Sequence, residues 1–163
     1  MTPTSVETDI VISAANNSYL VEWAGGGQVT EAIWRKRLDE IKAGLNPGQG
    51  IIFNALYLDA YLWSLHYPLL IQLKKEGYPI DGLTISAGVP SRENASEILK
   101  NLMSNGIWCN SFKPGSDSQI KSVLEIADDH PEFKIIIQVE GGKAGGHHSW
   151  EDLYGLLERN YST

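Results

Sequence analysis

Cysteine, long apolar runs and surplus positive charge are all scarce in this sequence, and each scarcity excludes a class of protein. Cys109 is the only cysteine in 163 residues, so no disulfide can form within the chain, and a reducing compartment is expected. No apolar stretch approaches the roughly 20 residues that a membrane-spanning helix needs. The net charge of -7 argues against binding nucleic acid through a basic face, and the first residues lack a signal-peptide pattern. We therefore expect a cytoplasmic protein with neither nucleic acid nor membrane as a partner.

Apolar segments typical of strands alternate with amphipathic segments typical of helices along the whole chain. The expected strands are Tyr19–Ala24, Gly50–Leu58, Gly82–Ala87, Gly106–Phe112 and Phe133–Glu140. The expected helices are Ser5–Asn16, Thr30–Ala43, Tyr61–Glu76, Ser91–Ser104, Ser116–Asp129 and Trp150–Arg159. For the last of these, Ser149 followed by Asp152 is close to a capping box. Because the strands start about 24 to 32 residues apart, the length of a strand with its crossover helix, residues 1–163 are predicted to form one α/β domain.

Two architectures fit this alternation. Continuously apolar strands such as Lys134–Ile137 are typical of a parallel sheet buried on both faces. Five strands suit an open flavodoxin-like sheet. They also suit a partial TIM barrel of about five βα units, since a complete barrel typically needs about 250 residues. The pattern of the residues alone leaves both alternatives open.

Glycine or another small residue stands at nearly every expected carboxyl end of a strand, where ligands bind in both architectures. This distribution favours a flat aromatic cofactor, because bulky side chains would collide with it. Two polar residues stand out there. Asn54 interrupts an apolar strand, as a hydrogen-bonded core amide or as a contact to a cofactor ring. Lys113 follows another strand, as a solvated side chain or as a cationic ligand contact.

The segment Gly141–Ser149 reads Gly-Gly-Lys-Ala-Gly-Gly-His-His-Ser and holds the densest potential chemistry. Its glycines leave backbone N–H groups open to an anion, and Lys143 adds positive charge. His147 and His148 suit proton transfer near neutral pH. The segment is not a P-loop, and two adjacent histidines without further ligands at metal spacing argue against a zinc site. The histidines of the helical regions, His66 and His130, are predicted to be structural.

Several of these motifs together resemble a known family, the enoyl reductase domain of the fungal-type fatty acid synthase beta subunit. More widely, they are similar to the superfamily of FMN-dependent nitronate monooxygenases and bacterial enoyl-ACP reductases. The resemblance runs through Met1–Thr4, Glu22–Gly27, Gly77–Ile80, Leu83–Ser91, Lys113–Ser116 and Gly141–Ser149.

The resemblance implies an FMN-binding TIM barrel that uses NADPH to reduce a trans-2-enoyl thioester carried on acyl carrier protein. His147 takes the catalytic role, with His148 as the fallback, because a histidine can donate a hydrogen bond or a proton to the substrate. The residues that the resemblance assigns to cofactor binding are Thr2, Ala24, Gly25, Asn54, Lys113, Gly141, Gly142, Lys143, Gly145 and Gly146.

The chain also departs from the family pattern. It is expected to begin after the first barrel strand and to stop before the last two, whose loop helps to hold the FMN phosphate. Glu140 stands where the fungal pattern has threonine. The chain is therefore expected to be a fragment that binds FMN weakly or not at all by itself, with other synthase domains or subunits as partners. The alternatives are a nitronate monooxygenase-like flavoenzyme and a non-catalytic fragment.

Overall fold

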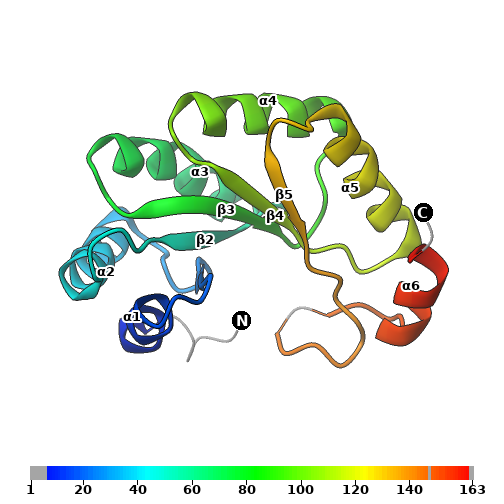
Figure 1. Ribbon diagram of the computed structural model, residues 1–163, viewed down its shortest axis with the longest axis horizontal. Coiled ribbons are helices and arrows are strands. Elements are labelled where there is room, and N and C mark those ends of the chain that lie inside the picture. The colour runs from blue at the N-terminus through cyan, green and yellow to red at the C-terminus, as the bar shows by residue number, and fades with distance from the viewer. Residues whose placement is uncertain (1–6, 147, 162–163) are drawn as a thin grey trace.

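The computed structural model describes residues 7–146 and 148–161, and the framework of this part is a five-stranded parallel sheet (Figure 1). The strands are β1 (Glu22–Ala24), β2 (Ile51–Leu56), β3 (Ile80–Ser86), β4 (Cys109–Phe112) and β5 (Lys134–Ile137). All five lie at the expected places, and every pair is parallel, so the α/β prediction is confirmed, although most strands are shorter than expected. Thr2 and His147, two of the predicted site residues, lie outside the described residues.

Most helices begin where a polar side chain caps them. The helices of the described part are α1 (Thr8–Asn16), α2 (Glu31–Gly44), α3 (Ala60–Lys75), α4 (Arg92–Ser104), α5 (Asp117–Asp129) and α6 (Leu153–Asn160). For α2 to α5, the residue before the helix accepts a hydrogen bond from a backbone N–H of the first turn; these caps are Thr30, Asp59, Ser91 and Ser116. The expected starts of these four helices therefore agree with the structure to within one residue.

The predicted start of α6 is wrong. The Ser149 hydroxyl accepts a hydrogen bond from the Glu151 backbone N–H, which closes a local turn instead of opening a helix. The helix begins at Leu153, because the Asp152 carboxylate accepts hydrogen bonds from the backbone N–H groups of Tyr154 and Gly155. Of the two residues of the near-capping box, the second is thus the cap. The shift lengthens the loop that precedes α6.

The strands follow the order β1-β2-β3-β4-β5 across the sheet. Consecutive crossovers of the same hand place their helices on one side of a sheet, and Figure 1 shows α2 to α5 as an arc around the outside. A flavodoxin-like sheet has the order 2-1-3-4-5 with helices on both faces. The flavodoxin-like alternative therefore does not describe this sheet, and the sequential order is the one found in a barrel.

A hydrogen bond between the two edges of the sheet shows how strongly the sheet curls. In a flat sheet, four spacings of about 4.8 Å would hold β1 and β5 roughly 19 Å apart. Nevertheless Gln138, which directly follows β5, donates from Nε2 to Oε2 of Glu22 on β1 at 2.9 Å. Two side chains of this length meet only if the sheet bends toward its inner face. The described sheet thus has the curvature of a barrel segment, while closure into a barrel stays a prediction.

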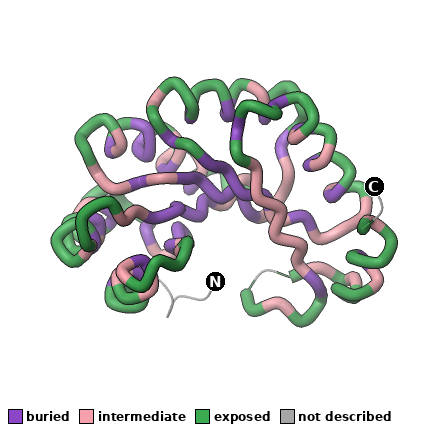
Figure 2. The backbone as a smooth tube through the Cα atoms, in the orientation of Figure 1, coloured by how far each residue is buried: buried purple, intermediate pink, exposed green. Residues whose placement is uncertain are grey.

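The outer face of the sheet packs an aromatic core against the helices, and Figure 2 shows that the strands through the middle of the molecule are largely buried. Trp34 from α2 stacks on Phe53 from β2 with ring centroids 4.2 Å apart, and Trp23 from β1 meets Phe53 edge-on. His66 from α3 completes the cluster, and its Nε2 donates to the Gln28 carbonyl at 2.8 Å. Burial lowers the pKa of His66, which is therefore neutral at pH 7. Its position agrees with the structural role predicted for it.

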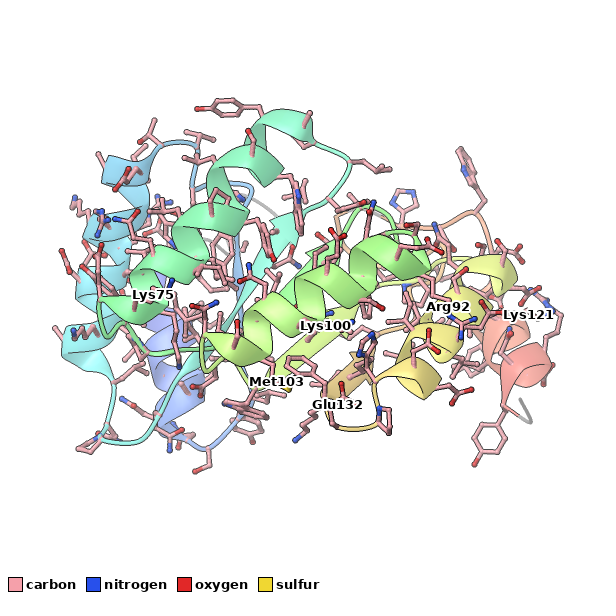
Figure 3. The ribbon with its side chains drawn as sticks, turned by 90° about the horizontal axis from the view of Figure 1, so that it is seen from above. Lys75, Arg92, Lys100, Met103, Lys121 and Glu132 are labelled. Atoms are coloured by element: carbon pink, nitrogen blue, oxygen red, sulfur yellow. The ribbon has the colours of Figure 1, made fainter. Side chains whose placement is uncertain are left out.

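The outward surface of the helical layer is polar. Figure 3 shows Lys75, Lys100 and Lys121 on α3, α4 and α5, on the side away from the sheet. Between these helices, His130 is buried and bonded through Nε2 to the Ser96 hydroxyl at 2.7 Å, again as a structural side chain. No helix in residues 7–146 and 148–161 combines the length and the apolar character that crossing a bilayer would require.

The last strand is less buried than its sequence predicts. The segment Lys134–Ile137 is partly or fully exposed at every position, because β5 pairs with β4 alone within the described sheet. At the other edge, Tyr19 and Leu20 are 70% and 55% exposed and precede β1 instead of forming part of it. Both edges of the described sheet are therefore open.

The start of the inner face is closely packed around the single cysteine. Cys109 on β4 is fully buried beside Gly82 on β3, where a side chain in place of the glycine hydrogen would collide with its Sγ. Burial raises the pKa of the Cys109 thiol to about 11. The thiol is thus protonated and enclosed in the folded protein.

Candidate functional site

A buried carboxylate organises the polar inner face of the sheet. Side chains alternate along a strand, so residues one position away from the outward aromatic core point inward. Glu22 on β1 is one of these, and its carboxylate accepts hydrogen bonds from Asn54 Nδ2 at 2.6 Å and from Thr84 Oγ1 at 2.7 Å. Gln138 donates to it as well and also reaches Ser111 Oγ at 2.7 Å. We call Glu22, Asn54, Thr84, Ser111 and Gln138 the inner-face network.

The inner-face network keeps Glu22 ionised. Burial alone would raise the pKa of this carboxyl, but the Lys113 ammonium and the hydrogen bonds from Asn54, Thr84 and Gln138 together lower it below the usual value. The side chain is only 14% exposed. Glu22 is not among the site residues predicted from the sequence. The available signal was a charged residue directly before buried Trp23 in an apolar strand, which is costly unless the charge is paired.

Lys113 lies between two carboxylates at the carboxyl end of β4. Its Nζ is 3.0 Å from Glu22 Oε1 and 3.6 Å from Glu140 Oε1. A backbone hydrogen bond from Glu140 N to the Pro114 carbonyl, 3.0 Å long, holds the segment after β5 beside the segment after β4. The Lys113 side chain is 12% exposed, so this ammonium is held in place by its partners and not solvated like a surface lysine.

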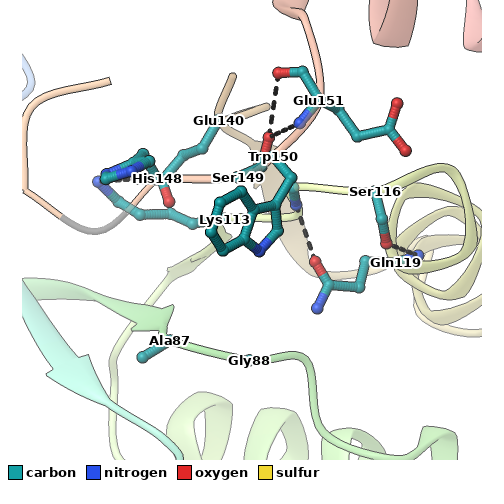
Figure 4. A pocket seen from close by; sticks show the side chains of 11 residues that line it. Ala87, Gly88, Lys113, Ser116, Gln119, Glu140, His148, Ser149, Trp150 and Glu151 are labelled. Carbon is teal, nitrogen blue, oxygen red and sulfur yellow. Dashed lines mark hydrogen bonds and ion pairs between the residues drawn. The ribbon is translucent and has the colours of Figure 1, made fainter. Parts of the chain in front are cut away.

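A pocket of about 380 Å³ opens beside Lys113 at the carboxyl ends of the strands (Figure 4). That volume is near the lower end of the range for small-molecule sites, which is about 300–1,000 Å³. Its charged lining side chains are Lys113, Glu140 and Glu151. The other lining residues are Ala87, Gly88, Gly115, Ser116, Gln119, His148, Ser149 and Trp150. The pocket is thus formed by the segments that follow β3, β4 and β5.

The end of β3 has an unusual backbone where it borders the pocket. Ala87 has φ of 54° and Gly88 has φ of 126°, both in the region that disfavours side chains. A non-glycine residue with such a φ costs about 1 kcal/mol or more, and strain of this kind concentrates at ligand sites. The turn carries the chain away from the pocket with only small side chains along the wall.

The glycine-rich segment contributes to the pocket only in part. His148 lines the pocket, and its Nδ1 lies 3.0 Å from the Gly146 carbonyl oxygen. Lys143 is exposed and is not a lining residue, so the structure does not bring it together with Lys113. Gly145 and Gly146 are exposed as well.

Three of the predicted cofactor glycines have packing reasons of their own. A Cβ at Gly141 would come within 2.6 Å of Leu153 Cβ, so glycine lets α6 approach the loop. A Cβ at Gly25 would collide with the Asn54 carbonyl, and glycine is required for the turn after β1. A Cβ at Gly142 would lie 3.2 Å from the Ser149 carbonyl oxygen, which is also a tight contact. These positions need no ligand to explain them.

Asn54 and Ala24 lie side by side in the register of β1 and β2, and both are buried. Asn54 uses both ends of its amide within the protein, since Nδ2 donates to Glu22 and Oδ1 accepts from Ser86 Oγ at 2.6 Å. The structure thus connects Asn54 with Lys113 through a shared carboxylate. In the described residues, no group of three or more His, Cys, Asp or Glu side chains is placed to hold a metal ion.

The chain is similar to a segment of fungal fatty acid synthase beta subunits. The family described as "Fatty acid synthase subunit beta/Fas1-like, helical" matches residues 134–163. The chain is 46% identical over 162 residues to the fatty acid synthase beta subunit aflB of Emericella nidulans, a match that covers 99% of the chain. It is 43% identical over 163 residues to the beta subunit pigK of Monascus ruber and 39% identical over 162 residues to the beta subunit of Saccharomyces cerevisiae. In each case the chain spans 8% of the relative's length.

Proposed function

Because this chain belongs, as a segment, to the fungal fatty acid synthase beta subunit family, we propose that it contributes to fatty acid synthesis as part of an FMN-dependent enoyl reductase. The observation that carries the proposal is the Lys113 ammonium, held by buried partners at a polar pocket on the carboxyl ends of parallel strands. The relatives described above are fatty acid synthase subunits, which favours this activity over a nitronate monooxygenase.

The pocket residues suit the ring system of a flavin. Lys113, whose ammonium is held at the pocket by its carboxylate partners, can donate a hydrogen bond to a ring carbonyl. Ser116, Gln119 and Ser149 add hydrogen-bonding groups around a volume that fits a planar ring, and the turn at Ala87 and Gly88 presents little side-chain bulk. Bound FMN would supply hydride transfer, with NADPH as the source of the electrons.

The protein's own residues would handle the proton and the position of the substrate. His148 lines the pocket and can donate a hydrogen bond to a thioester oxygen. His147, the residue to which the resemblance assigns catalysis, is its neighbour in the sequence and lies outside the described residues. The acyl chain would arrive on acyl carrier protein, with other synthase domains as the further partners.

A flavin titration tests the proposal. Purified chain is titrated with FMN while flavin fluorescence is followed, and the expected result is weak, saturable binding. Lys113→Met should weaken it about tenfold, the worth of one charge-assisted hydrogen bond. Lys121→Met is the matched control, since it removes an exposed lysine from the outer surface of α5, and it should change affinity little. Equal losses in both variants would contradict the role of Lys113 in flavin binding.

A single-turnover assay tests the histidines. In a complete barrel that contains this sequence, assayed with dithionite-reduced FMN and an enoyl thioester, His147→Ala should slow reduction about 10²–10⁴-fold while FMN binding is retained. His148→Ala should have a much smaller effect. The reverse ranking would move the proton donor to His148, and no turnover by the unchanged chain would support a non-catalytic fragment.

A further inference from the structure

The charges around the pocket do not add up to an anion site. The charged side chains that line it are Lys113, Glu140 and Glu151. Lys113 is already paired with Glu140 and also with Glu22, which does not line the pocket. The two carboxylates differ in how firmly they are held. Glu22 is 14% exposed and bonded on all sides by the inner-face network, so it cannot leave Lys113 without leaving several donors unpaired.

Glu140 is held much less firmly. Its side chain is 21% exposed, it faces the pocket, and its only ion pair in the described part of the chain is the longer one to Lys113, at 3.6 Å. A ligand that needs the Lys113 ammonium must therefore share it with Glu140 or push that carboxylate aside. A neutral group can accept one hydrogen bond from Lys113 while the ion pair with Glu140 stays intact. An anionic group at the same place is repelled by the Glu140 carboxylate at close range.

We propose that Glu140 is a specificity-determining residue, which competes for Lys113 from inside the pocket and biases the site toward neutral, hydrogen-bond-accepting ligands over anionic ones. The inference holds for any ligand of this pocket and does not require a flavin. It also accounts for a lysine at a binding pocket that offers no net positive charge.

Paired aldehydes that label lysine test the proposal without a flavin. Pyridoxal 5′-phosphate and pyridoxal form the same imine and differ by the charged phosphate. After trapping with borohydride, mass spectrometry of peptides gives the ratio of phosphate-bearing to phosphate-free label at each lysine. Taking the ratio cancels changes in the reactivity of the amine itself. Exposed Lys121 on α5, on the outer surface in Figure 3, is the internal reference.

Glu140→Gln should raise the ratio at Lys113 about fivefold and leave Lys121 unchanged, since it removes one nearby charge at a partly exposed site. Glu151→Gln is the matched control. It removes the same charge from the same wall, but Glu151 pairs with Arg159 at 2.9 Å and is absent from the partners of Lys113. The ratio should therefore change little. An equal rise in both variants, or no rise with Glu140→Gln, would overturn the proposal.

A second measurement covers the case in which the aldehydes fail to reach Lys113. Inorganic phosphate is titrated against the chain while the NMR signal of the Lys113 side chain is followed. Phosphate should shift that signal in the Glu140→Gln protein at concentrations that leave the unchanged protein unaffected. Identical titrations of the two proteins would contradict the competition between Glu140 and an anion.

Discussion

The two faces of one sheet use neighbouring residues of the same strands in opposite ways. On the outer face, Trp23 and Phe53 are fully buried against helices and interact through shape and area. On the inner face, Glu22 and Asn54, each next to one of those aromatics, interact through short directional bonds. The outer face can lose a contact and repack, while the inner face has few contacts, each with a fixed geometry.

The outer face therefore provides most of the stability, whereas the inner face fixes the geometry of the site. Burying an aromatic side chain contributes about 2–3 kcal/mol, and the outer cluster contains several. The net contribution of a buried ionic network is small, because desolvation offsets most of the attraction. What the inner-face network provides is the position of Lys113 and the contact between the two edges of the curled sheet. The predictions below test this division, beginning with the largest effect.

Truncating the centre of the aromatic core should be the most damaging change. Phe53→Ala should lower the free energy of unfolding by about 3–5 kcal/mol, since it removes a fully buried ring that contacts Trp23, Trp34 and His66. Urea denaturation measures the loss. Leu58→Ala, at a side chain that is 75% exposed, is the control and should stay within about 0.5 kcal/mol. A loss below about 1 kcal/mol at Phe53 would show that this cluster does not carry the stability.

Removing the inner carboxylate should cost less but affect the site more. Glu22→Ala should lower the free energy of unfolding by about 2–3 kcal/mol, because it leaves buried donors from Thr84 and Gln138 without an acceptor. Glu22→Gln should cost less, since it keeps the shape and one acceptor oxygen. Both should shift the side-chain NMR signal of Lys113, which Phe53→Ala should leave near its place if the protein stays folded. An unchanged Lys113 signal in Glu22→Gln would contradict the positioning role.

Gly25, in the turn after β1, and Gly145, in the loop after β5, should respond differently to an added methyl group. Gly25→Ala should destabilise the protein by about 1–3 kcal/mol, because the new Cβ would collide with the Asn54 carbonyl. Gly145→Ala should have little effect on stability, because, among the described residues other than its chain neighbours, no atom lies within 4 Å of a Cβ built there. Thermal unfolding of the two variants makes the comparison. If Gly25→Ala were harmless, the turn after β1 would have more freedom than the structure shows.

The smallest predicted effect is a two-step dependence of stability on pH. His66 has a lowered pKa in the folded state, so below about pH 6.5 the unfolded chain takes up a proton that the folded protein resists, and stability falls. Glu22 also has a lowered pKa when folded, so its contribution is present above about pH 4.5 and is lost as the pH falls further. Urea midpoints between pH 3 and 8 should show both steps. Glu22→Gln should reduce the lower step, to which exposed carboxylates with a lowered pKa such as Glu76 also contribute, and His66→Gln should remove the upper one. An upper step that survives His66→Gln, or a lower step that Glu22→Gln leaves unchanged, would refute this assignment.

The sequence predicts the outer face far better than the inner one. Strand positions and four helix starts follow from local signals, namely apolar runs and caps such as Thr30 and Ser91. Lys113 and Asn54 were recognisable because each is a polar residue at or within an apolar strand. Glu22 was missed because its partners Asn54, Thr84 and Gln138 lie 32, 62 and 116 residues away. No local pattern reports such a meeting, and the curl that produces it is a property of the assembled sheet.

The same limit explains the error at α6. Two capping residues, Ser149 and Asp152, compete within four positions, and the sequence favoured the first. Leu153, the first residue of α6, packs so closely against Gly141 that a side chain at Gly141 would collide with it. This contact joins residues 12 positions apart and is not apparent from the capping residues alone.

The enclosed thiol of Cys109, on β4 beside β3, can serve as a probe of strand separation in the sheet. Cys109 is the chain's only cysteine, and with a pKa of about 11 and no exposed surface it is inert toward a thiol reagent at neutral pH while the strands are closed. Each transient separation of the two strands would expose it and let the reagent react irreversibly. The rate of labelling therefore measures how often the two strands separate at the start of the inner face, and no engineered probe is needed. If the reagent reacts rapidly and completely with the native protein, these strands separate often; if labelling follows the global unfolding rate, the start of the inner face opens only when the whole fold does.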